Sequence, residues 1–108
     1  MTSELEKQFF DTFGIEPKIL STAIGHGFYI EHSRVEKYPQ ITDRILLELI
    51  RIIGLITIKY TNEQCGICFG DGVTSYFGKD LKEAILNFLI SKVSIFKQQV
   101  RILFEEGQ

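Results

Sequence analysis

The sequence predicts a single α+β domain over residues 1–108, in which a small antiparallel sheet packs against three or four helices. Two observations predict this class. Apolar residues recur at helical spacing in some segments and alternate with polar residues in others, and the links between the expected strands are too short for parallel crossovers. With 108 residues, 44% of them hydrophobic and 24% charged, the chain can bury a core without a metal or a disulfide.

The first expected element is a helix over residues 3–13. Ser3 and Glu6 have the spacing of a capping box, in which Ser3 accepts from the amide of Glu6 and Glu6 reaches back to residue 3. Gly14 and Pro17 end the helix. Its apolar face consists of Leu5, Phe9, Phe10 and Phe13.

A hairpin is expected over residues 19–32. Residues 19–24 and 28–30 are rich in β-prone types, and Gly25-His26-Gly27 between them is a turn signal. A loop wrapped on the core is the alternative. The polar stretch 33–39 is interpreted as a connection.

The second helix is expected over residues 42–53, capped by Thr42 and ended by Gly54. Its polar residues form one narrow stripe of Arg44, Glu48 and Arg51, in which Glu48 can pair with both arginines. Because the rest of its circumference is apolar, this helix must be covered on more than one side.

A three-stranded meander is expected over residues 55–77. Apolar and polar residues alternate over 55–61, and two further β-prone runs follow at 64–69 and 73–77. The Asp-Gly pair within Gly70-Asp71-Gly72 is a strong hairpin signal between the last two runs. The hairpin at 19–32 could join the same sheet.

The remaining helical pattern covers residues 80–93 and 95–106. One uninterrupted helix over 80–106 would be about 40 Å long, which is too long for a domain of this size. We therefore expect a bend or break near 91–94. A strand at 100–104 is the alternative for the last segment.

The pair Cys65 and Cys68 has the spacing of a redox dithiol or of half a zinc site. In a regular strand, residues three apart point to opposite faces, so the thiols are expected to diverge and one to be buried. The competing hypothesis is a four-ligand zinc site that also recruits His26 and His32, although this order and spacing match no zinc finger.

Other chemistry is weakly supported. The 12 basic residues are outnumbered by 14 acidic ones, and the one basic cluster, Lys92, Lys97 and Arg101, is interpreted as a solvated helix face rather than a nucleic-acid footprint. The carboxylates are scattered and the glycines fit turns. We expect no cofactor, no membrane-spanning segment and a cytoplasmic location.

Two classes of function follow. The first is a small non-enzymatic interaction module that binds an unknown protein or a second copy of itself, of the kind carried as bacterial or phage accessory proteins. Its expected surface lies on the two broadest apolar helices and consists of Leu46, Ile50, Ile53, Leu86, Ile90 and Val93.

The second class is a ligand- or zinc-binding domain, or a small enzyme with an unrecognised site. It would need residues of the two hairpin regions to converge in space. Those residues are His26, His32, Cys65, Cys68, Asp71 and Tyr76.

Overall fold

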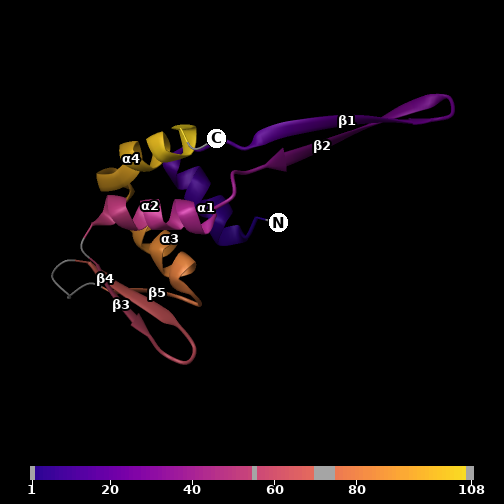
Figure 1. Cartoon of the computed structure of the whole chain (residues 1–108). Helices are drawn as coiled ribbons and strands as arrows, with labels where there is room; N and C mark the ends of the chain where they lie inside the picture. The colour runs from indigo at the N-terminus through magenta and orange to yellow at the C-terminus, as the bar shows by residue number, and fades with distance from the viewer. Residues whose placement is uncertain (1, 55, 70–74, 107–108) are drawn as a thin grey trace.

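A computed structural model of the chain describes residues 2–54, 56–69 and 75–106, except for some side chains in the first hairpin and at the ends of β4, β5 and α4. It confirms the α+β class, with four helices and two small antiparallel sheets (Figure 1). The elements are α1 (Glu4–Phe13), β1 (Lys18–His26), β2 (Tyr29–Lys37), α2 (Asp43–Ile53), β3 (Ile56–Tyr60), β4 (Cys65–Phe69), β5 (Ser75–Gly78), α3 (Leu81–Ser91) and α4 (Val93–Glu106).

The four helices and the sheet β3–β5 form a body around one aromatic-rich core. The ring of Phe9 lies 4.9 Å from Phe13 and 5.9 Å from Phe104, centroid to centroid. These rings come from α1 and α4, and the buried face of α3 completes the same cluster with Ile85, Phe88 and Leu89. The apolar face predicted for the first helix therefore packs in the core of the body.

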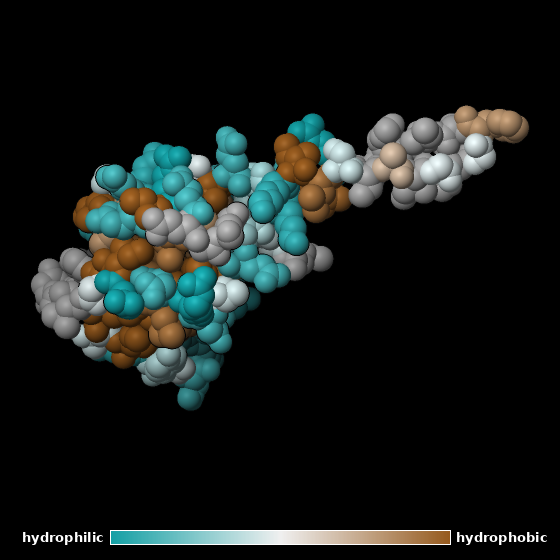
Figure 2. All heavy atoms as spheres, turned by 45° about the horizontal axis from the view of Figure 1, so that its top comes forward, coloured by the Kyte–Doolittle hydropathy of each residue, from teal (hydrophilic) through white to brown (hydrophobic). Residues whose placement is uncertain are grey.

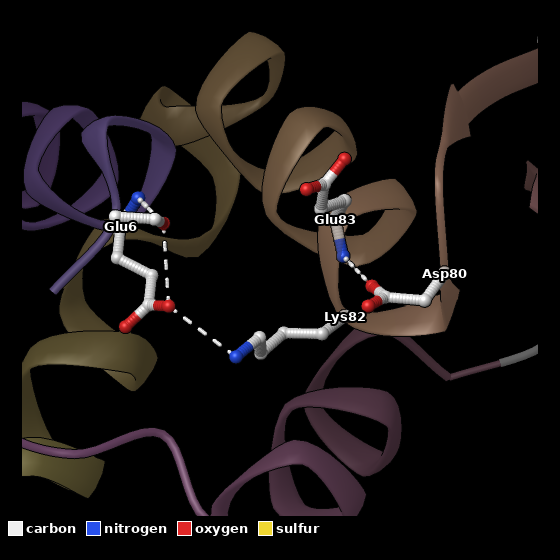
Figure 3. A network of polar contacts seen from close by, with 5 residues as sticks. Glu6, Asp80, Lys82 and Glu83 are labelled. Carbon is white, nitrogen blue, oxygen red and sulfur yellow. Dashed lines mark hydrogen bonds and ion pairs between the residues drawn. The ribbon is translucent and has the colours of Figure 1, made fainter. Parts of the chain in front are cut away.

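The N-terminus of α1 is fixed by its cap and by α3. As predicted, the Ser3 hydroxyl accepts from the amide of Glu6, at 3.2 Å. The Glu6 carboxylate accepts from the Ser3 hydroxyl and from the Lys82 ammonium, each at 3.3 Å (Figure 3). Beside it, Asp80 caps α3 by accepting from the amide of Glu83 at 2.9 Å. The Glu6 carboxylate thus takes part both in the cap of α1 and in the ion pair between α1 and α3.

Helix α2 begins at the predicted cap, where Thr42 accepts from the amide of Ile45 at 3.3 Å. It packs against α4 and α3, which supplies the covering on more than one side that its apolar circumference requires. Within the polar stripe, Glu48 pairs with Arg51 at 3.2 Å.

The C-terminal segment forms two helices, and the break between them lies within the predicted range 91–94. Lys92 lies between α3 and α4 with φ −116° and ψ 28°, and its amide donates to the carbonyls of Phe88 and Leu89, both at 3.1 Å. The alternative of a strand at 100–104 is wrong, because these residues continue α4 and bury Val100 and Phe104 against the core.

The predicted meander is present as β3–β4–β5, with one face packed on α3. Ile67 in the central strand pairs with Ile58 on one side and Tyr76 on the other. Thr61 and Gln64 close the first turn through backbone and side-chain hydrogen bonds. The turn predicted at 70–72 lies outside the described residues.

The first hairpin differs from its prediction in three ways. It is longer, because the segment 33–37, interpreted as a connection, continues β2 in register until Lys37 pairs with Lys18. Its two-residue turn is Gly27-Phe28 rather than residues 25–27, since His26 pairs with Tyr29. It forms a sheet of its own instead of joining the meander. We call the segment 18–37 the arm, because it projects from the body (Figure 1).

Candidate interaction arm

The arm extends the molecule well beyond its compact body. The chain measures 65 × 32 × 21 Å and has a radius of gyration of 17.4 Å, whereas a compact chain of 108 residues has one of about 13 Å. Strands β1 and β2 pack on each other along their whole length, and among the described elements neither packs extensively against a helix or against the second sheet. Within the described part of the chain, no helix and no strand of the second sheet packs along the arm.

Apolar side chains of the arm are exposed at its root and at its tip. Ile19, Leu20 and Val35 near the root are each about half exposed, and Phe28 at the tip is as exposed as in an extended chain, at 109%. Figure 2 shows brown apolar surface where the arm leaves the body and a lighter brown tip at its far end. A two-stranded hairpin is marginally stable on its own in water, so an arm with this surface is typical of a segment that a partner covers.

The turn explains why an aromatic residue stands at the tip. Gly27 has φ 64°, whereas no described non-glycine residue has a positive φ. A glycine at the first central position followed by a residue with negative φ is the pattern of a type II′ turn, which matches the twist of the flanking strands. Phe28 occupies the second central position, where its side chain has no neighbouring strand to pack on.

A groove of about 460 Å³ lies at the root of the arm, between the body and the start of β1 and the end of β2. We call it the root groove. Its lining includes Glu16, Lys18, Tyr38, Ile45 and Phe104. Tyr38 stacks on Phe10 with ring centroids 5.5 Å apart and planes 13° apart. Partial burial raises the pKa of Tyr38, and the carboxylates of Asp11 and Glu36 raise it further, so its hydroxyl is neutral at physiological pH.

The two cysteines point to opposite faces of β4. Cys65 pairs with Tyr60 and Gly78 and belongs to the core, on the side that faces α3. Cys68 pairs with Thr57 and lies on the other face, and both cysteines are buried and are not joined by a disulfide. Burial raises the pKa of Cys65, an effect that the hydrogen bond from Tyr60 partly opposes. A buried, protonated thiol separated from its neighbour by the sheet is suited to packing rather than to dithiol chemistry.

The residues of the predicted zinc or ligand site are not brought together. His26 and His32 belong to the arm, whereas Cys65 and Cys68 belong to the second sheet on the far side of the body (Figure 1). Tyr76 packs edge-on against Phe88, with centroids 5.2 Å apart. Asp71 lies outside the described residues, as do the side chains of both histidines. Among the side chains that the structure does describe, no group of three or more His, Cys, Asp or Glu could hold a metal ion.

The six residues of the predicted interaction surface lie in or against the core. Ile53 and Leu86 are buried, because α2 and α3 direct them into the shared cluster. Leu46, Ile50, Ile90 and Val93 are partly buried and pack on that cluster. The apolar residues that the described helices do expose are Leu47, Ile95 and Ile102.

Sequence reasoning located the turn region but missed the arm as a site. A usable signal lies in residues 19–25, which form a β-prone run of seven residues without a charge. Strand edges that face water normally carry charges, so such a run indicates an edge that another strand covers. The exposure of Phe28 had no comparable signal, since an aromatic residue next to a glycine is also common in packed turns.

Comparison of the chain with protein-family models, curated proteins and solved structures gave no match. None of the described helices combines the length and the apolar character that crossing a membrane requires.

Proposed function

We propose that this chain is a small protein-interaction module without catalytic activity, and that the arm carries the contact with its partner. The observation that carries the proposal is the fully exposed Phe28 at the tip of a hairpin that its own chain leaves uncovered. Aromatic residues are enriched at protein interfaces, where a few buried side chains supply most of the binding energy.

The amount of exposed surface supports the same proposal. The chain has a solvent-accessible surface of 7586 Å², whereas a compact monomer of 12.4 kDa exposes about 6,100 Å². The surplus of about 1,500 Å² exceeds the roughly 800 Å² that each partner buries in a standard interface. The chain as a whole therefore exposes more surface than a compact monomer, by an amount large enough for a standard interface.

The charges of the arm favour a protein partner. Lys18, Arg34 and Lys37 are balanced in part by Glu31 and Glu36, so the arm has no basic stripe of the kind that nucleic acid requires. Binding would rest on apolar side chains and on the unpaired backbone groups of the strand edges, as in recognition by β-strand addition.

A photo-crosslinking amino acid at position 28 tests the proposal in cells that produce the protein. The control carries the same amino acid at Gln98, which is exposed on α4. We expect a discrete covalent protein adduct from position 28 and none from position 98. Excess intact chain should compete the adduct away, and a chain with residues 19–36 replaced by Asn-Gly should not. Absence of the adduct, or equal competition by both chains, would overturn the proposal.

A further inference from the structure

The four open strand edges of the described structure are not equally protected. Natural sheets block unwanted pairing with short edge strands and with charged side chains. Strand β5 has four residues, β3 has five with Lys59 among them, and β2 carries Glu31, Arg34 and Glu36. Strand β1 has nine residues and no charge between Lys18 and His26. The edge of β1 is therefore the one that is open to pairing.

The backbone groups available on that edge follow from the turn. In a hairpin closed by a two-residue turn, the residues that flank the turn form a hydrogen-bonded pair, and such pairs recur at every second position. His26 and Tyr29 flank the turn here. Even-numbered residues of β1 therefore direct their amides and carbonyls toward β2. Ile19, Ser21, Ala23 and Gly25 direct theirs toward the open edge.

From this edge we infer that the arm pairs with the arm of a second copy, β1 against β1 in antiparallel orientation, around a two-fold axis at Thr22; this deepens the proposed function and rests on it. When the two-fold axis is perpendicular to the sheet, one residue must lie opposite its own copy. Only then do the paired side chains of the two strands point to the same face of the sheet. Thr22 is the middle residue of β1, so this register uses all nine residues.

The residue pairs of this register are complementary. Ser21 would lie opposite Ala23 of the second copy, and Leu20 opposite Ile24, which places apolar positions together. Thr22 opposite its own copy is a favourable cross-strand pair. The ends bring Lys18 opposite His26, so no two Lys, Arg, Asp or Glu residues face each other.

The same register accounts for the exposed tip and the root groove. With His26 of one copy opposite Lys18 of the other, the turn of each arm extends past the start of β1 in its partner. Phe28 then reaches the level of Pro17 and Glu16, and Glu16 lines the root groove. Two arms of about 30 Å lie side by side. Each tip meets the other body at the root groove, whose mixed lining includes the apolar Ile45 and Phe104 beside charged residues.

Sedimentation equilibrium of the full chain with matched proline variants tests the inference. Ala23→Pro removes an amide that points to the open edge of β1, and proline is tolerated at such a position. His32→Pro is the control, because residue 32 is the register partner of Ala23 and its amide points to the opposite edge of the arm.

We expect the intact chain and His32→Pro to form dimers of twice 12.4 kDa, and Ala23→Pro to be monomeric. Phe28→Ser should raise the dissociation constant about 30-fold or more, as loss of an interface anchor does. Should Ala23→Pro fail to keep the far-ultraviolet spectrum of the intact chain, Ser21→Lys places a charge on the same edge without a backbone change and should also be monomeric.

Engineered disulfides test the proposed register. Thr22→Cys should crosslink two copies under mild oxidation, because residues opposite each other across the axis have Cβ atoms within about 5.5 Å. Leu20→Cys lies opposite position 24 and should not crosslink. A monomeric intact chain at hundreds of micromolar, or equal crosslinking by both variants, would overturn the self-pairing. If position 28 then still crosslinks to a different protein, the proposed function stands while this inference falls; loss of both results removes both.

Discussion

Gly78 at the end of β5 lies directly against the backbone of Ala84 in α3. A Cβ atom at position 78 would stand 2.5 Å from the nitrogen of Ala84 and 2.5 Å from the Cβ of Glu83. Because the first of these contacts is with helix backbone, neither partner can move aside without shifting α3 from the sheet.

Gly78→Ala is therefore expected to lower the free energy of unfolding by about 2–3 kcal/mol, the cost of overpacking a rigid contact. Gly66→Ala is the matched control, because its new Cβ would meet only the ring of Phe77, which is half exposed and can turn away. Urea denaturation of both variants measures the difference. Equal losses would contradict this account of the contact between β5 and α3.

Two leucines of the same helix, α2, differ strongly in burial, so the same substitution should affect stability differently at each. Leu49 is fully buried, whereas Leu47 is 62% exposed two residues earlier. Leu49→Ala should lower the free energy of unfolding by about 2–5 kcal/mol, and Leu47→Ala should change it by about 0.5 kcal/mol or less. Thermal unfolding followed by circular dichroism distinguishes them. A large loss at Leu47 would mean that another surface covers this side of α2.

Stability should fall as pH rises above 9.0, the ordinary pKa of a thiol. Burial raises the pKa of Cys65, so the unfolded chain releases this proton at a lower pH than the folded chain. Above the unfolded value the unfolded state binds fewer protons, and the free energy of unfolding therefore decreases with pH. Below that value the contribution is constant.

Urea midpoints measured from neutral pH to above 10.0, the ordinary pKa of tyrosine, check this dependence. Cys65→Ala should lose the part of the decline that begins at the thiol, while the later contribution of Tyr38, whose pKa is also raised, remains. An identical profile in the variant would show that Cys65 titrates normally.

Removal of the arm should leave the body folded. Because the arm packs little against the helices, a chain with residues 19–36 replaced by Asn-Gly is expected to keep its unfolding temperature in dilute solution, where association does not contribute. Differential scanning calorimetry at several concentrations measures this. The intact chain should gain stability with concentration and the shortened chain should not.

The sequence predicted those parts of the fold whose causes are local. Ser3 and Thr42 accept from amides three residues later, and such caps mark where helices begin whatever the tertiary structure is. The break at Lys92 was predicted from length alone, because a domain of this size cannot cover an uninterrupted helix.

The parts that were missed depend on contacts between distant segments. A hairpin that packs on a core and one that projects from it have the same turn and strand residues, so residues 19–32 could not distinguish them. The predicted surface failed at Ile53 and Leu86 for a related reason. An apolar face on a helix indicates that its side chains are covered. It does not indicate whether the same chain or another chain covers them.

The arm leaves and rejoins the body at adjacent points, since Lys18 pairs with Lys37. The arm is therefore an insertion between α1 and α2 whose two ends lie side by side. The proposed binding segment and the residues that form the body therefore occupy separate stretches of the sequence. If the proposal is right, substitutions between 19 and 36 should change recognition while the body stays intact, and the segment could be exchanged with that of another chain as a unit.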